Sequence, residues 1–179
     1  MAETFLSSRW GYRGLFVLLA GGMLFFRLLP LSTQPGGVPG PDLMLCLAFA
    51  WVMRRPDYVP APLIAAVFLV ADMLMMRPPG LWALLVLLGS EFLRARGSLA
   101  RALPFVLEWV LVGGVMGALM LANRLVLELA MVPQAGLGLT LLQMVLTVVA
   151  YPAVVIASHL GLGVTRAAPG KADGRGRRL

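Results

Sequence analysis

Asp72-Met-Leu-Met-Met-Arg-Pro-Pro-Gly-Leu81 is the stretch that decides the fold of this chain, because two apolar runs meet in it at a break. Proline cannot sit in a helix interior and disfavours helix for the residue before it, so the stretch predicts a turn between two helices. Asp72 lies inside the first run, about one helical turn from the break. An ionisable side chain is costly in lipid, so Asp72 marks a structural or functional site.

The composition indicates an integral membrane protein. Of the 179 residues 60% are hydrophobic and only 13% are charged, whereas soluble domains contain about 25% charged residues. The net charge of +7 would suggest nucleic acid as a partner in a soluble protein. Here almost all basic residues lie between and beyond the apolar runs, which favours a role in topology and contact with anionic lipid, with no nucleic acid.

The apolar runs predict six membrane spans, at residues 14–31, 40–53, 60–76, 79–93, 102–130 and 137–161. A crossing takes about 20 apolar residues, so the short second and fourth spans predict a compact bundle. We expect one transmembrane domain over residues 1–164, with an uncleaved first span, and a basic, disordered tail over residues 165–179.

The basic residues give the orientation. All but three of the 15 lie on one side of the predicted spans, and the exceptions are Arg27, Arg77 and Arg124. The positive-inside rule then places both termini in the cytoplasm. The predicted fold class is an all-α, compact bundle of six transmembrane helices in a multi-pass membrane protein.

Six charged residues fall at a similar depth near the outer ends of the spans: Arg27, Asp42, Asp72, Arg77, Arg124 and Glu128. Each would cost about 2.5–3.5 kcal/mol unpaired in lipid, but the set is neutral. Arg124 and Glu128 are four residues apart on one helix face and can meet directly. Arg27 is then left to find Asp42 or Asp72 across helices.

Two interpretations of these charges remain open. They can extend separately to the outer interface, although Asp72 is too short to reach far. Alternatively they form a polar cluster that fixes the bundle or receives a ligand or a partner helix. Contact between Asp72 and Arg77 across the turn is also left open. Nearer the cytoplasm, Glu91 and Glu108 are expected to form interfacial ion pairs with neighbouring arginines, Glu91 with Arg94 by i, i+3 spacing.

Small residues mark one helix for close packing. Gly114, Ala118 and Ala122 form one stripe at four-residue spacing, and Gly113 and Gly117 form its neighbour. Such stripes let helix backbones approach closely. We expect packing within the chain rather than a dedicated dimer face.

No catalytic constellation is visible in the sequence. There is no glycine-rich phosphate loop, no zinc-type spacing and one histidine, and the candidate nucleophiles Ser90, Thr147 and Ser158 have no evident base. We therefore expect no enzyme and no catalytic, cofactor-binding or metal-binding residues.

An ordered series of segments resembles the rod shape-determining MreD family. The segments are Gly40-Pro-Asp-Leu-Met-Leu-Cys-Leu-Ala-Phe-Ala-Trp51, Arg55-Pro-Asp-Tyr-Val-Pro60, Ala71-Asp72, Arg77-Pro-Pro-Gly-Leu-Trp-Ala-Leu84, Glu91-Phe-Leu-Arg94 and Phe105 to Val110. The likeness covers roughly residues 40–112. It implies a fold similar to that of the substrate-binding S-components of vitamin transporters.

The resemblance implies a non-enzymatic scaffold of the bacterial inner membrane that belongs to the cell-elongation complex. Its implied partners are the transmembrane helix of MreC, together with RodA, a penicillin-binding transpeptidase and MreB. The alternative is a vitamin-binding membrane subunit like the S-components, with a gated pocket formed by the outer charges and the loop from Ser32 to Pro41.

Overall fold

The computed structural model describes residues 9–29, 39–101, 104–134 and 136–162, and within these ranges the chain is all-helical. Its elements are α2 (Arg9–Leu28), α3 (Leu43–Arg54), the 3-10 turn η1 (Pro56–Tyr58), α4 (Ala61–Leu74), α5 (Leu81–Arg101), α6 (Phe105–Leu129) and α7 (Leu137–Leu162). The predicted helical class is confirmed over these residues. The tail expected at residues 165–179 lies outside them.

Three helices are long and apolar enough to cross a membrane: Arg9–Leu28, Phe105–Leu129 and Leu137–Gly161. α3 and α4 are apolar but have only 12 and 14 residues. α5 has 21 residues and continues well past the expected end of its span at residue 93. Charged residues end an apolar run without ending a helix, because Glu, Arg, Ala and Leu all favour helix. The Glu91–Arg94 ion pair, 3.2 Å long, confirms the predicted i, i+3 contact on this extension.

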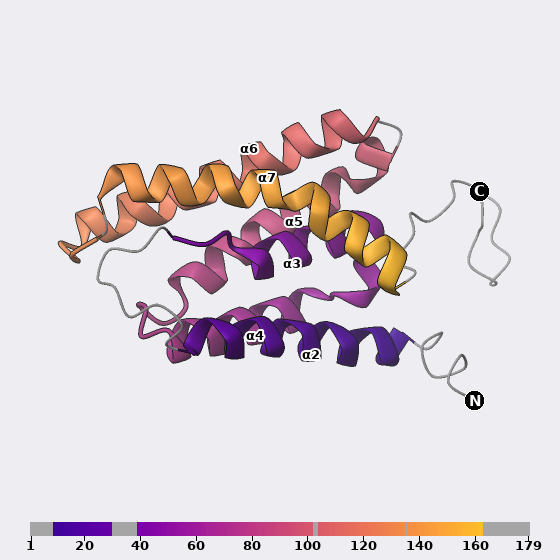
Figure 1. Cartoon of the computed structure of the whole chain (residues 1–179), viewed down its shortest axis with the longest axis horizontal. Coiled ribbons are helices and arrows are strands. Elements are labelled where there is room, and N and C mark those ends of the chain that lie inside the picture. Colours follow the sequence, from indigo (N-terminus) through magenta and orange to yellow (C-terminus); the bar gives the residue numbers. More distant parts are fainter. Residues whose placement is uncertain (1–8, 30–38, 102–103, 135, 163–179) are drawn as a thin grey trace, which may run out of the picture.

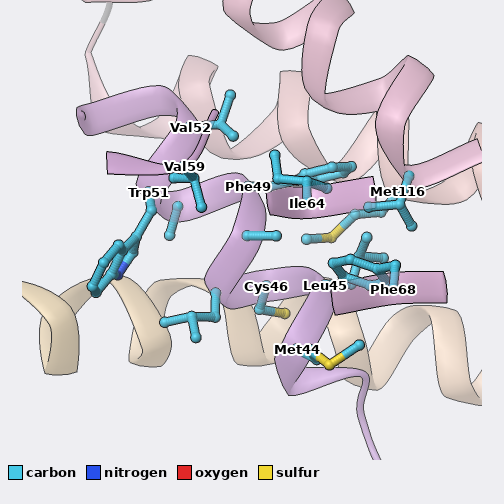
Figure 2. Packing of buried hydrophobic residues seen from close by; sticks show 14 of the residues in the cluster. Met44, Leu45, Cys46, Phe49, Trp51, Val52, Val59, Ile64, Phe68 and Met116 are labelled. Atoms are coloured by element: carbon cyan, nitrogen blue, oxygen red, sulfur yellow. The ribbon is translucent and has the colours of Figure 1, made fainter. Parts of the chain in front are cut away.

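The short helix α3 is the centre of the molecule. Figure 1 shows α6 and α7 together on one side, α2 and α4 on the other, and α3 and α5 between them. Every residue of α3 after Leu43 is buried. Figure 2 shows Leu45 and Phe49 of α3 in one cluster with Ile64 and Phe68 of α4. A helix that is apolar all round belongs in a core, and α3 is that helix.

Aromatic rings hold the C-terminal end of α3 against α2 and η1. Tyr12 of α2 stacks on Tyr58 of η1 with ring centroids 4.2 Å apart, and Trp51 of α3 meets both rings edge-on at 6.4 Å. The Trp51 Nε1–H also donates to Ser158 Oγ of α7 at 3.3 Å. The start of α2 and the end of α7 therefore lie at the same end of the bundle (Figure 1).

α4 and α6 end in the same way, each with a methionine in the left-handed region. Met76 has φ 52° and Met131 has φ 53°. After α4 the Arg77 amide donates to the Asp72 carbonyl at 3.0 Å, and after α6 the Val132 amide donates to the Leu127 carbonyl at 2.9 Å. These are the hydrogen bonds of a Schellman C-cap, which usually uses glycine at this position. The turn predicted after Asp72 is thus confirmed.

Pro152 lies inside α7, which changes direction in its C-terminal half (Figure 1). Proline has no amide hydrogen, so the carbonyl four residues earlier, that of Val148, loses its partner within the helix. The Trp109 Nε1–H of α6 donates to this carbonyl at 2.8 Å. The bend in α7 is therefore coupled to its contact with α6.

Gly89 sets the approach of α5 to its neighbours. A Cβ atom at this position would lie 2.7 Å from Leu119 Cδ1 of α6 and 3.0 Å from Phe49 Cζ of α3. Real Cβ atoms do not approach so closely, so only glycine fits without a shift. Gly14 on α2 is exposed, and a Cβ atom there would have no neighbour within 4 Å.

Replacing these two glycines should have opposite effects. Gly89→Ala should lower the free energy of unfolding by about 1–3 kcal/mol, because it overpacks the α3–α5–α6 contact. Gly14→Ala is the control and should raise it by a few tenths to about 1 kcal/mol through helix propensity alone. Unfolding titrations in mild detergent measure both, and equal shifts of the same sign would contradict this packing.

Candidate functional site

Asp72 is fully buried and binds the N-terminus of α5. Its Oδ2 accepts hydrogen bonds from the backbone amides of Gly80, at 3.2 Å, and Ala83, at 3.1 Å. The first amides of a helix have no acceptor within the helix, and they carry partial positive charge. A carboxylate at this end accepts their hydrogen bonds and balances that charge. The sequence left Arg27 and Arg77 as candidate partners, but the structure places Asp72 on backbone amides across the turn.

Asp42 forms the N-cap of α3 and pairs with Arg27. Its Oδ1 accepts from the Leu45 amide at 3.2 Å, and its Oδ2 lies 3.7 Å from Arg27 Nη1. Arg27 Nη2 also donates to the Pro41 carbonyl at 3.0 Å, and the Asp42 amide donates to Thr147 Oγ1 at 3.0 Å. These bonds join α2, α3 and α7 at one end of the bundle. The sequence left Asp42 and Asp72 as candidate partners for Arg27, and in the structure Arg27 pairs with Asp42.

A polar pocket of about 270 Å³ lies at this same end, between the starts of α3, α5 and α7 and the end of α6. Its cationic and amide-bearing lining consists of Arg77, Asn123, Arg124, Gln134 and Gln143. Arg124 Nη1 donates to Thr140 Oγ1 at 3.1 Å, and Gln134 Nε2 donates to the Arg124 carbonyl at 3.1 Å. These bonds fix the turn between α6 and α7 over the pocket. Glu128, one turn beyond Arg124, is exposed.

A buried ion pair at the opposite end was not predicted. Arg54 Nη1 of α3 donates to Glu108 Oε1 of α6 at 2.8 Å, and the Tyr151 hydroxyl of α7 donates to the same oxygen at 2.9 Å. The side chains of Arg54 and Glu108 are only 7% and 2% exposed. The expectation of an interfacial pair for Glu108 is wrong, because it begins α6 directly against the end of α3. The predicted topology had already placed Arg54 and Glu108 on the cytoplasmic side, and this was the one indication in the sequence that they could meet.

The stripe of Gly113 and Gly117 on α6 faces α7. A Cβ atom at Gly113 would lie 3.1 Å from Val148 Cγ1, and one at Gly117 would lie 3.3 Å from Met144 Sδ. Both contacts are tighter than most Cβ contacts, so α6 and α7 approach as closely as the two glycines allow.

The other stripe, Gly114, Ala118 and Ala122, behaves differently. Gly114 and Ala118 are exposed, Ala122 is half-buried, and a Cβ atom at Gly114 would have no neighbour within 4 Å. Gly114 and Ala118 line an apolar groove of about 350 Å³ along the α6–α7 contact. The groove is an open surface on which a further helix can pack.

Removing the Glu108 carboxylate should strongly destabilise the fold. Glu108→Gln leaves the buried Arg54 guanidinium without a counter-charge, and breaking such a pair costs about 3–5 kcal/mol. Glu91→Gln is the matched control, since its pair with Arg94 is 46% exposed on the glutamate side and is worth about 0–1 kcal/mol. Unfolding in detergent compares the two, and similar losses would contradict a special role for Glu108.

Two substitutions of Asp72 separate capping from charge pairing. Asp72→Asn keeps an acceptor oxygen for the Gly80 and Ala83 amides and should cost about 0.3–1 kcal/mol of charge–dipole energy. Asp72→Ala removes both hydrogen bonds and should cost about 1–3 kcal/mol. The exposed Asp57→Ala controls for loss of a carboxylate elsewhere. If Asp72→Asn and Asp72→Ala lowered the melting temperature equally, the charge of Asp72 and not its hydrogen bonds would stabilise this turn.

The six predicted intramembrane charges therefore do not form one cluster. Arg27 and Asp42 pair, Asp42 also joins Arg77 and Arg124 in lining the end pocket, Asp72 caps α5 and Glu128 is exposed. Comparison with known proteins adds no relative: no family model, curated protein or solved structure matches the chain.

Proposed function

We propose that this chain is a non-enzymatic scaffold of the MreD kind in the bacterial inner membrane. In this role it binds the transmembrane helix of MreC and helps to position peptidoglycan synthesis. The ordered resemblance over roughly residues 40–112 supports the family. The open groove between α6 and α7 supports the mode of action and is the observation that carries the proposal.

The proposed topology has six spans and both termini in the cytoplasm. Contacts at one end of the bundle support it: Arg13 Nη2 donates to the Asp57 carbonyl at 3.4 Å, and Arg94 Nη2 donates to the Val59 carbonyl at 2.7 Å. The start of α2, the connection after α3 and the C-terminal half of α5 therefore share one end, and all are rich in arginine. The positive-inside rule assigns that end to the cytoplasm.

The groove has the chemistry of a helix-binding surface in lipid. Helices in a membrane associate through close packing, and exposed glycine and alanine at four-residue spacing let a second backbone approach. Gly113 and Gly117 already pack against α7. Gly114 and Ala118 are therefore the small residues that remain exposed for a partner helix. Exposed Leu121 and Leu141 border the groove and offer dispersion contacts to a partner side chain.

A vitamin-binding subunit remains the second candidate, and the polar end pocket is the observation that favours it. Ligand pockets commonly measure about 300–1,000 Å³, so 270 Å³ is small for a vitamin. Thermal stabilisation by members of a vitamin panel would support this candidate over the scaffold.

Blocking the groove should release the partner without unfolding the chain. Gly114→Leu and Ala118→Leu fill open space, so we expect unchanged thermal stability and at least a tenfold lower recovery of MreC in mild-detergent co-purification, on the order of 1.4 kcal/mol. Gly21→Leu on α2 is the control, because its Cβ also has no neighbour within 4 Å. Undiminished recovery with both groove variants would refute this surface as the docking site.

A further inference from the structure

The end pocket contains a cation that has no partner in the described chain. Arg77 is half-buried and lines the pocket, and its guanidinium makes no hydrogen bond or ion pair with any residue that the structure places. A guanidinium carries five N–H donors, and removing a charge from water is costly unless it is paired. The contrast with Arg27, Arg54 and Arg94, which all hold carboxylates, singles out Arg77.

Further polar groups around Arg77 are also unused. Trp82 is only 6% exposed, yet its indole N–H has no acceptor among the described residues. The half-buried side-chain amides of Asn123 and Gln143 likewise make no hydrogen bond in the ranges that the structure covers. All three residues line the pocket. Unpaired polar groups that converge on one pocket are the kind that fix the orientation of a bound ligand, so these groups indicate a ligand-binding surface.

The charges that line the pocket favour an anion. Its one carboxylate, Asp42, is already held by Arg27 and by the N-terminus of α3. Asp72 does not line the pocket, and its Oδ2 accepts from the amides of α5, so Arg77 and Arg124 are the other charged side chains that line the space. The N-terminal end of α7 adds positive potential at the same place, whereas that of α5 is already neutralised by Asp72.

We propose that this pocket binds a phosphate-bearing group, either a soluble phosphate ester or the headgroup of an anionic phospholipid. The planar guanidinium of Arg77 matches the phosphate oxygens, and the neighbouring amides and the indole N–H add neutral hydrogen bonds. A volume of about 270 Å³ admits a phosphate-bearing headgroup. The site can be tested apart from the scaffold role, because Arg77 and Asn123 line the pocket and not the α6–α7 groove, although Arg124 and Thr140 line both.

Two binding measurements on the full chain distinguish the sources of phosphate. Calorimetry in detergent tests inorganic phosphate and glycerol 3-phosphate, and native mass spectrometry tests retention of phosphatidylglycerol against phosphatidylcholine. Binding in the first measurement identifies a soluble ester, and selective retention in the second identifies a lipid headgroup. An absence of binding in both overturns the proposal.

Substitutions then locate the site. Arg77→Gln should weaken binding by about tenfold or more, because it removes a charge-assisted contact, while its melting temperature without ligand stays unchanged. Asn123→Asp should abolish binding by placing a negative charge in the pocket. Arg96→Gln, an exposed position far along α5, controls for the loss of one positive charge. If Arg77→Gln and Arg96→Gln bind alike, the phosphate lies elsewhere and the proposal fails.

Discussion

The short helix α3 is the constraint on which the rest of the structure depends. At 1.5 Å per residue its 12 residues span about 18 Å, far less than a hydrocarbon core of about 30 Å. Its charged ends are therefore partnered within the protein: Arg27 meets Asp42 at the N-terminus, and Glu108 meets Arg54 at the C-terminus. Each α3 charge has the sign that the helix dipole favours at that end. α2 and α6 are thereby fixed to opposite ends of one buried helix.

Several other polar side chains satisfy backbone groups of neighbouring elements. Asp72 accepts from the first amides of α5, and Trp109 donates to the carbonyl that Pro152 leaves open. Arg94 donates to the Val59 carbonyl at the end of η1. Lipid offers no water to such groups, so each helix end or break inside the apolar region needs a donor or acceptor from a neighbour. Polar residues in this apolar chain thus mark where its helices are interrupted.

The pattern of apolar runs and prolines was enough to predict six helices, their order and the turn after Asp72, because these depend on local chemistry. The Glu91–Arg94 contact was predictable for the same reason. The partner of Glu108 was not, since it comes from α3, and sequence spacing does not reveal which helices are neighbours. The capping role of Asp72 was also missed: charge balance pointed to an arginine, whereas the local turn geometry presents backbone amides.

The unequal helix lengths have a consequence for the surrounding lipid. At 1.5 Å per residue α4 is about 21 Å long and α6 about 38 Å long, and they lie on opposite sides of the molecule. α4 exposes Val70 and Met73, so its side also contacts lipid tails in the proposed six-span arrangement. The bilayer is then compressed beside α4 and stretched beside α6, at a cost of fractions of a kcal/mol per Å. Such a thickness gradient favours long partner helices beside α6 and α7 and short ones beside α4.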